Sequence, residues 1–184
     1  MVEKIKKYKI GIRRFGLINW VGAWTLYKKE VLRFLIVWAQ TLFSPLISSL
    51  LFLMVLSLAI GGGRGEVLGV SFITFLAPGL IAMQVIQQSF SHSSSSFMIG
   101  KIQGNIVDLL YAPLSATEVT ISVALAAVTR SFMIAIVSII TFYLIIDIQI
   151  KYFFTLIFFT FISSFILGNI GIIAGLWAEK FDHM

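Results

Sequence analysis

The amino-acid sequence predicts an all-α integral membrane protein. Hydrophobic residues account for 59% of its 184 residues, charged residues account for 12%, and the mean hydropathy is +0.99. A soluble domain carries about 25% charged residues, so lipid rather than water is the predicted solvent. Four stretches are apolar over the roughly 20 residues that a helix needs to cross a bilayer: residues 34–60, 70–90, 119–146 and 152–178.

The distribution of basic residues predicts the orientation of these spans. Residues 1–33 hold nine of the 14 Lys and Arg residues, and basic residues beside spans favour the cytoplasm. With the N-terminus inside, eleven basic residues lie on the cytoplasmic side, and Arg64 and Lys151 lie outside. The basic block has no apolar core before a cleavage site, unlike a signal peptide, and its place beside a span argues against binding nucleic acid. We therefore divide the chain into a cytoplasmic region, residues 1–33, and a transmembrane domain, residues 34–184.

The second half of the cytoplasmic region predicts an amphipathic elbow helix that lies in the membrane interface and leads into the first span. Apolar and aromatic side chains fall on one face of this helix: Leu17, Trp20, Trp24, Tyr27 and Val31. Asn19, Lys29 and Glu30 fall elsewhere. Tryptophan and tyrosine favour the headgroup boundary, and helices of this kind lie along it. The alternative is a plain cytoplasmic extension of the first span.

The first span is longer than a ~30 Å hydrocarbon core requires at ~1.5 Å per residue, so a tilt or kink is expected. Proline removes a helical hydrogen-bond donor. The expected kink sites are therefore Ser44-Pro45 in the first span and Pro78-Gly79 in the second. The glycine-rich residues 61–65 predict a flexible turn on the outer side.

Between the second and third spans lies an island of mixed polarity, residues 100–118, with the sequence GKIQGNIVDLLYAPLSATE. On a helix that starts at Lys101, one face carries Ile102, Ile106, Leu109 and Leu110, and the other carries Lys101, Asn105 and Asp108. Pro113 ends this helix, because the residue before a proline avoids the helical region. Ser115 and Glu118 then match a capping box. The island therefore predicts a short amphipathic cytoplasmic helix, a break, and the start of the third span.

The last two spans contain one charge and one stripe of small residues. Arg130 lies within an apolar span, where a charge is costly unless it is paired, hydrated or able to reach the interface. It either snorkels or forms a structural ion pair, or it serves a polar pathway or a subunit contact. The fourth span carries small residues on one narrow face: Ser164, Gly168, Gly171 and Gly175. Such a stripe lets helix backbones approach closely, so it predicts packing.

No pattern in the sequence predicts catalysis, a metal site or a cofactor site. The two histidines, His92 and His183, do not form a metal-ligand motif. The chain has no cysteine, which excludes thiolate chemistry. The phosphate-binding pattern G-x-x-x-x-G-K-[ST] is missing, because Ile102 follows Gly100-Lys101. We therefore expect a protein that is not an enzyme and does not hydrolyse ATP.

Several segments together resemble the membrane subunits of ABC exporters, the ABC-2 type transporter permease family. They are the basic N-terminus with its elbow helix, FLAPGLIAM in the second span, the island at 100–118, AAVTRS in the third span and the closing GLWAEKFDHM. The similarity covers essentially the whole chain, and the island is its most specific part.

The resemblance implies a function for the island, because the family uses this loop as a coupling helix that docks on a separate ATPase subunit. The implied docking residues are Gly100, Lys101, Gly104, Asn105, Ile106, Asp108, Leu109, Leu110 and Pro113. The resemblance also implies a bacterial inner membrane and a pair of permease copies, most simply a homodimer. ATP and magnesium would bind the two ATPase subunits. An amphipathic, lipid, glycan or drug-like substrate would be exported along the interface between the permeases.

The chain departs from the family in its number of spans. Family members have six spans, whereas four are predicted here, so we expect an N-terminal fragment; a naturally short subunit is the alternative. The rival function is a membrane scaffold or assembly factor without its own energy source. A membrane enzyme acting on lipid-linked sugars is a third, weaker hypothesis, because the sequence offers no cluster of acidic residues at one membrane face.

Overall fold

The computed structural model describes residues 18–60, 66–67, 69–146 and 152–179. The elements in chain order are α1 (Trp20–Ile36), α2 (Trp38–Ile60), β1 (Glu66–Val67), β2 (Val70–Ser71), α3 (Phe72–Ile102), α4 (Ile106–Tyr111), α5 (Ala116–Ile145) and α6 (Phe153–Trp177). The helices α2, α3, α5 and α6 are long and apolar enough to cross a membrane. The predicted class, an all-α membrane protein, is therefore confirmed. Leu17, the turn at 61–65 with Arg64, Lys151 and His183 lie outside the described residues.

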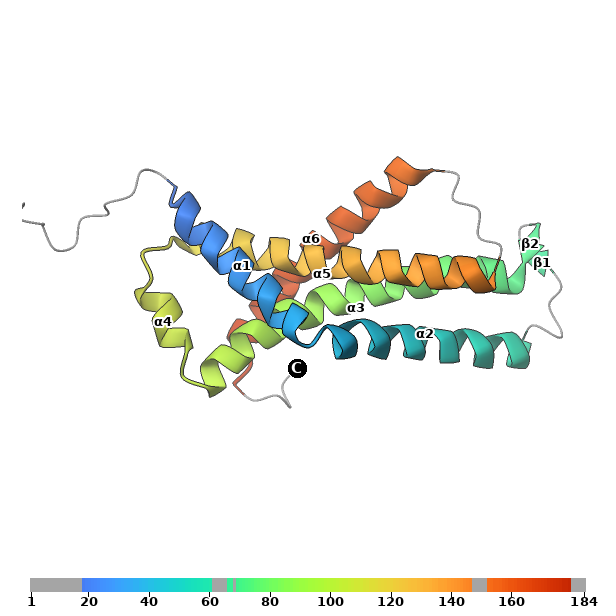
Figure 1. The fold of residues 1–184 in the computed structure, drawn as a ribbon, viewed down its shortest axis with the longest axis horizontal. Coiled ribbons are helices and arrows are strands. Elements are labelled where there is room, and N and C mark those ends of the chain that lie inside the picture. Colours follow the sequence, from blue (N-terminus) through green and yellow to red (C-terminus); the bar gives the residue numbers. More distant parts are fainter. Residues whose placement is uncertain (1–17, 61–65, 68, 147–151, 180–184) are drawn as a thin grey trace, which may run out of the picture.

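The helices α2, α3 and α5 run along the long axis of the molecule, and α6 crosses them obliquely (Figure 1). α3 is the central helix and contacts α2, α5 and α6. The short helix α4 lies at one end of this bundle, and the strands β1 and β2 lie at the opposite end (Figure 1). The two strands form an antiparallel pair, with Val67 opposite Val70. The two ends of the bundle therefore differ, and one of them carries the island.

The predicted first span is divided into two helices at Val37. This residue has φ −107° and ψ 35°, outside the helical region. The hydroxyl of Thr41 donates to the carbonyl of Phe34 at 3.4 Å. Phe34 is near the end of α1, where backbone carbonyls have no amide donor within the helix. α2 continues as one helix through Pro45, and α3 continues through Pro78. The helix is therefore interrupted at Val37, and the crossing helix begins four residues later than predicted. The kinks expected at Ser44-Pro45 and Pro78-Gly79 do not interrupt their helices and stay predictions.

α1 exposes its aromatic face and buries another. Trp20 and Trp24 are 74% and 64% exposed, whereas Leu26, Glu30 and Phe34 are buried. In a membrane protein an apolar face gains little by turning inward, because lipid tails are as apolar as a protein core. The inward face of α1 is consequently available for a polar group that finds partners in the bundle.

α3 extends well beyond the predicted second span. That span was expected to end at residue 90, whereas α3 continues to Ile102. The serine-rich residues 89–96 belong to this helix, and Ser89, Ser93 and Ser94 are buried. The hydroxyl groups of Ser89 and Ser131 hydrogen-bond to each other between α3 and α5. Small side chains let neighbouring helices approach closely, so the serine-rich stretch is a packing surface.

The capping box at the start of α5 is confirmed. The Ser115 hydroxyl accepts from the Glu118 amide at 3.3 Å, and the Glu118 carboxylate accepts from the Ser115 amide at 2.7 Å. Each interaction satisfies an amide that a helix start leaves without a partner. These bonds fix the residue at which α5 begins.

Two apolar clusters form the core at the two ends of the bundle. The cluster nearer to α4 consists of Leu26, Phe97, Val123, Ala124 and Ile172. The cluster nearer to the strands consists of Leu53, Ala77, Leu80 and Phe142. Because the first cluster takes side chains from α1, α3, α5 and α6, these four helices meet beside the island.

Candidate functional site

The island joins α3 to α4 through a tight turn. Gly104 has φ +75°, a left-handed conformation that glycine adopts without a side-chain clash. The amide of Gln103 donates to the Ile99 carbonyl, and the amide of Gly104 donates to the Lys101 carbonyl, which is a common way for a helix to end at glycine. The prediction of a helix starting at Lys101 is therefore wrong. Residues 101–102 end α3, and α4 begins at Ile106.

α4 turns some side chains toward the bundle and others outward. Ile106 and Leu109 are partly buried and pack against the apolar cluster nearer to α4. Leu110 and Tyr111 are 77% and 86% exposed, and Val107 is exposed as well. The turn at residues 103–105 changes the helical register. The predicted common face of Ile102, Ile106, Leu109 and Leu110 is therefore wrong, because Ile102 and Leu110 are exposed.

The remaining docking residues of the island lie around α4. Gly100 belongs to the last turn of α3, and a side chain placed there would come within 4 Å of Ile106. Gly104, Asn105 and Asp108 are exposed. We define the outward surface of α4 as Val107, Asp108, Leu110 and Tyr111. This surface has one carboxylate among apolar and aromatic side chains.

Lys101 does not belong to that outward surface. Its ammonium donates to the backbone carbonyls of Leu176 and, at 3.0 Å, Ala178, at the end of α6. The last carbonyls of a helix lack internal donors and carry partial negative charge, so a lysine there stabilises the helix end. The predicted placement of Lys101 on the polar outward face is corrected: its side chain links α3 to α6.

The start of α1 is tied to the segment between α4 and α5. The Glu118 carboxylate accepts from the Asn19 amide at 2.6 Å. The Asn19 side chain donates to the Pro113 carbonyl at 3.2 Å and accepts from the Gly22 amide at 3.0 Å, which caps α1. The elbow helix and the island are thus joined by hydrogen bonds. No pattern in the sequence pointed to this connection, because its partners lie about a hundred residues apart.

The small residues of α6 form a seam with the helices beside it. A Cβ atom added to Gly171 or Gly175 would lie 2.5 Å or 2.6 Å from a backbone oxygen of α3. Gly168 lies against α5 and α3, and both it and Ser164 are buried. At Gly171 and Gly175 the two backbones leave no space for a side chain.

Arg130 projects from α5 toward α3. Its guanidinium donates to the side-chain oxygen of Gln88 at 2.7 Å. Within the part of the chain that the structure describes, no carboxylate pairs with Arg130, and its buried Nε has no hydrogen-bond partner. A structural ion pair was one of the alternatives for Arg130. In the described ranges Arg130 contacts the neutral amide of Gln88 instead of an acidic side chain.

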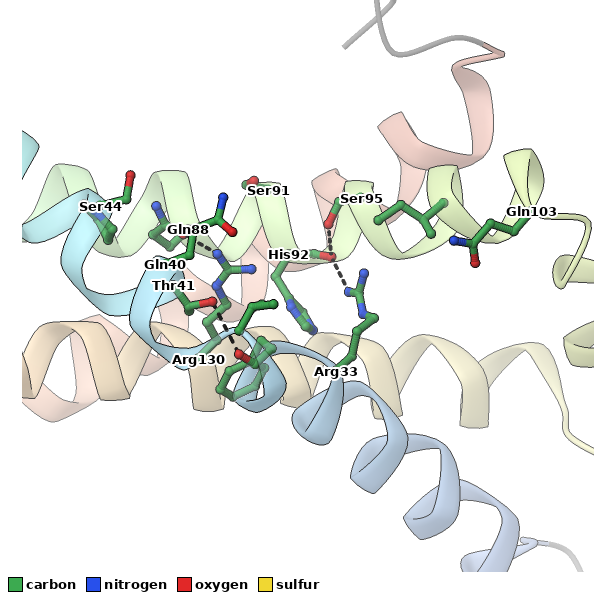
Figure 2. A pocket seen from close by; sticks show the side chains of 14 residues that line it. Arg33, Gln40, Thr41, Ser44, Gln88, Ser91, His92, Ser95, Gln103 and Arg130 are labelled. Carbon is green, nitrogen blue, oxygen red and sulfur yellow. Dashed lines mark hydrogen bonds between the residues drawn. The ribbon is translucent and has the colours of Figure 1, made fainter.

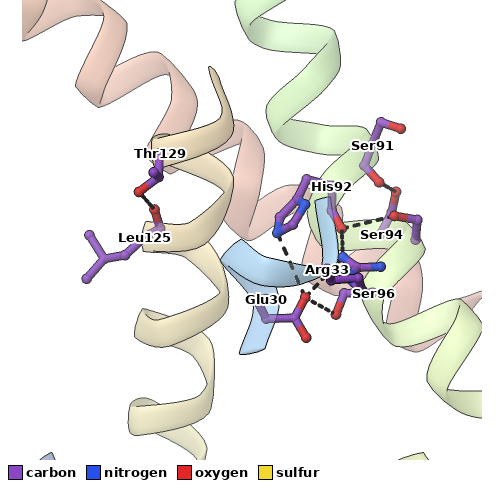
Figure 3. Close-up of polar contacts among 9 residues, drawn as sticks. Glu30, Arg33, Ser91, His92, Ser94, Ser96, Leu125 and Thr129 are labelled. Atoms are coloured by element: carbon purple, nitrogen blue, oxygen red, sulfur yellow. Dashed lines mark hydrogen bonds and ion pairs between the residues drawn. The ribbon is translucent and has the colours of Figure 1, made fainter. Parts of the chain in front are cut away.

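A second polar cluster connects α1 to α3 (Figure 3). The Glu30 carboxylate pairs with Arg33 at 3.0 Å and accepts from the Ser96 hydroxyl at 2.8 Å. Arg33 also donates to the His92 carbonyl at 3.1 Å, and His92 Nε2 lies 3.8 Å from Glu30. A buried carboxylate is costly unless it is hydrogen-bonded, and these contacts offset that cost for Glu30. The sequence signal for the cluster was the four-residue spacing of His92 and Ser96. This spacing places both residues on one face only if the helix continues past residue 90.

A cavity of about 600 Å³ lies between α1, α2, α3 and α5, next to this cluster (Figure 2). Ten of its 14 lining residues are polar or charged. The lining residues are Arg33, Phe34, Val37, Gln40, Thr41, Ser44, Pro45, Gln88, Ser91, His92, Ser95, Ile99, Gln103 and Arg130. Figure 2 shows Arg33 and Arg130 reaching it from different helices. In the described residues, no group of three or more His, Asp or Glu side chains could hold a metal ion.

The fold and the site define a polytopic helical membrane protein that presents a short, partly apolar helix at one end of its bundle. The chain belongs to the ABC-2 type transporter family, whose model matches residues 22–184. The resemblance seen in the sequence is thereby confirmed.

Individual relatives are similar over most of the chain. The "Inner membrane transport permease YadH" of Escherichia coli (strain K12) is 28% identical over 167 residues, and so are the proteins of that name from Escherichia coli O157:H7 and Shigella flexneri. The match covers 91% of this chain and 65% of each relative. The chain thus spans less than two thirds of the length of these curated relatives. No solved structure matches it.

Proposed function

We propose that this chain is the membrane permease of an ABC exporter in a bacterial inner membrane, with its N-terminus in the cytoplasm. A separate ATPase subunit binds ATP and magnesium and docks on the outward surface of α4. The permease works as a pair of copies, most simply a homodimer, in contact with membrane lipids. Its substrate is an amphipathic, lipid, glycan or drug-like molecule.

The observation that carries this proposal is the exposure of apolar side chains on α4. Val107, Leu110 and Tyr111 are exposed on a loop that the predicted orientation places in the cytoplasm, where no lipid covers them. Aromatic and large apolar side chains beside a single charge are the composition of a protein–protein contact. Membership of a transporter family supports an ATPase as the partner.

The contacts of α4 supply a route by which the ATPase acts on the spans. Ile106 and Leu109 pack on a cluster shared by α1, α3, α5 and α6. Lys101 links α3 to the end of α6, and Glu118 links α5 to the start of α1. Movement of α4 therefore displaces four helices together. The joint at Val37 lets α2 follow a different path, and alternating inward and outward openings form between copies.

A co-purification experiment tests the docking surface. The full-length permease is expressed with its ATPase subunit as wild type and as the double variant Val107→Ser, Leu110→Ser. Truncating two exposed apolar contacts is expected to lower ATPase recovery about tenfold or more, since interface anchors contribute ~1–2 kcal/mol or more each. Tyr152→Ser, at an exposed aromatic residue just before α6, is the matched control and should retain wild-type recovery.

The same experiment separates the proposal from its rival. Equal ATPase recovery with both variants would contradict docking on α4. If the wild-type permease recovers no ATPase although both proteins are produced, the scaffold hypothesis gains support instead.

A further inference from the structure

The polar cavity between α1, α2, α3 and α5 has a positive wall. Arg33 and Arg130 both line it, and none of the Asp and Glu residues that the structure describes does. We propose that this cavity binds a phosphate group, carried by an anionic lipid-like molecule or by a soluble phosphate compound. The proposal does not depend on ATPase docking, because the cavity and α4 involve different surfaces.

The charge of the cavity is only partly balanced. Glu30 lies beside the cavity and neutralises Arg33, which it contacts at 3.0 Å. Arg130 has only the neutral amide of Gln88 as a hydrogen-bond partner in the described residues. An uncompensated guanidinium within a membrane span is unfavourable, so the site lacks one negative charge.

The cavity is also short of hydrogen-bond acceptors. The Nε atoms of Arg33 and Arg130 and the ring nitrogens of His92 are enclosed beside the cavity without a hydrogen-bond partner within the described part of the chain; of the two ring nitrogens, a neutral imidazole needs an acceptor for only one. More than about 90% of buried polar groups in proteins are hydrogen-bonded, so such a concentration around one cavity is unusual. A phosphate group brings several acceptor oxygens and the missing negative charge.

The geometry of the walls suits a phosphate group in particular. A guanidinium can give two parallel hydrogen bonds to phosphate oxygens, and here two guanidiniums face one space from α1 and α5. Two serines also line the cavity, Ser44 on α2 and Ser91 on α3. A cavity of about 600 Å³ is large enough for a headgroup, since ligand pockets range from about 300 to 1,000 Å³.

The depth of the cavity fits a ligand that enters from the α4 side of the membrane. Fifteen residues separate Arg130 from Ile145 at the opposite end of α5, which is about 22 Å of helix. With Ile145 at one boundary of a ~30 Å hydrocarbon core, Arg130 lies in the third nearest to α4. Headgroups of that leaflet are therefore the nearest phosphates.

Thermal unfolding of the full-length protein in an uncharged detergent tests the proposal. The midpoint is measured with added phosphatidylglycerol, with phosphatidylcholine, and with sodium pyrophosphate against sodium chloride of equal ionic strength. A ligand that binds only the folded protein raises the midpoint. We expect phosphatidylglycerol or pyrophosphate to raise it, and phosphatidylcholine and sodium chloride not to. A response to the lipid assigns the site to headgroups, and a response to pyrophosphate alone assigns it to a soluble phosphate.

Two variants locate the response. Gln88→Glu keeps the contact with Arg130 but supplies the missing charge, so it is expected to weaken binding about tenfold or more while preserving the fold. Arg130→Gln is expected to act in the same direction. Lys28→Gln removes a positive charge at an exposed position on α1, outside the cavity, and should bind like the wild type.

The outcomes that overturn the proposal are equally definite. They are no rise with phosphatidylglycerol or with pyrophosphate, a rise with phosphatidylcholine as large as that with phosphatidylglycerol, or the same affinity in Gln88→Glu as in Lys28→Gln. If Arg130→Gln does not fold, the Gln88→Glu measurement decides alone.

Discussion

Asp108 is the single charge on the outward surface of α4, and its side chain is exposed. A carboxylate amid apolar contacts adds specificity to an interface more than affinity, and a carboxylate that binds a partner does so by facing a basic group, which a reversed sign would repel.

We therefore expect Asp108→Lys to lower the ATPase activity and the amount of ATPase bound to the permease, by about tenfold, or ~1.4 kcal/mol. Asp108→Asn, which removes the charge without reversing it, should show a smaller effect. Binding measured by co-purification at low and high salt distinguishes the two. Wild-type binding by the lysine variant would show that the carboxylate does not face the ATPase.

Gly171 and Gly175 are residues at which size alone decides the packing. An added Cβ at Gly171 would approach the Phe90 carbonyl oxygen to 2.5 Å, closer than van der Waals contact allows. Backbone cannot yield as a flexible side chain does, so α6 must move away from α3.

We expect Gly171→Ala to lower the free energy of unfolding by ~1–3 kcal/mol, the usual cost of overpacking. Gly79→Ala is the matched control, since Gly79 also lies within a helix but has no described residue within 4 Å of an added Cβ. Alanine favours the helix there by ~0.5–1 kcal/mol. The midpoints of thermal unfolding report both changes, and equal midpoints would refute the close seam.

At the scale of elements, α1 is held by its ends. Asn19 caps the first turn and reaches the Pro113 carbonyl, while Glu30 and Arg33 bond to α3 near the other end. These polar contacts lie in or beside the membrane, where interhelical hydrogen bonds contribute roughly 0.6–2 kcal/mol each. Hydrogen bonds therefore hold the elbow helix to the island at one end and to the bundle at the other.

Removing the first of these ties should loosen α1. We expect Asn19→Ala to lower the free energy of unfolding by ~1 kcal/mol, the usual value of an N-cap, and to increase hydrogen exchange in the first turn of α1. Thr25→Ala is the control, because among the described residues the Thr25 hydroxyl bonds only to the Val21 carbonyl within the same helix. Unchanged exchange in Asn19→Ala would mean that the cap and the Pro113 contact contribute nothing.

The elements differ in how far the sequence could predict them. Hydropathy located the spans, and the capping box located the start of α5, because both signals depend on neighbouring residues. The extension of α3 was missed because serine and glutamine lower hydropathy without breaking a helix. The start of α4 was missed because the left-handed conformation of Gly104 shifts the register by an amount that periodicity cannot supply.

The candidate site was predictable only where it is local. The exposed surface of α4 follows from a short amphipathic segment between spans. Lys101 was misplaced, and the cluster of Glu30, Arg33 and His92 was not found, because both depend on contacts between residues far apart in the chain. In α1, moreover, Trp20 and Trp24 are exposed and the carboxylate of Glu30 is buried, the reverse of the rule for soluble proteins.

For the whole molecule, docking of an ATPase on α4 depends on which end of the bundle faces the cytoplasm. α4 and the strand pair lie at opposite ends (Figure 1), so one must face the cytoplasm if the other faces outward. The basic residues of the first 33 positions favour the end that carries α4 as the cytoplasmic one.

The absence of native cysteine allows a direct test of this orientation. Single substitutions Val70→Cys and Leu110→Cys, both at exposed positions, are treated with a membrane-impermeant maleimide on intact spheroplasts. We expect labelling at Val70→Cys without permeabilisation and at Leu110→Cys only after it. The opposite pattern would invert the topology and remove α4 from the cytoplasm.

A crosslink from α4 to the ATPase subunit would show directly that the ATPase docks on this helix. Leu110→Cys in the full-length permease, carrying a photoactivatable maleimide, is irradiated in membranes that contain the ATPase, with and without ATP. If the ATPase docks on α4, we expect Leu110→Cys to give a crosslink whose yield changes with nucleotide. We expect a weaker crosslink from the partly buried Ile106→Cys and none from Val70→Cys. If the ATPase is shown to be present and Leu110→Cys gives no crosslink to it, docking on α4 is contradicted.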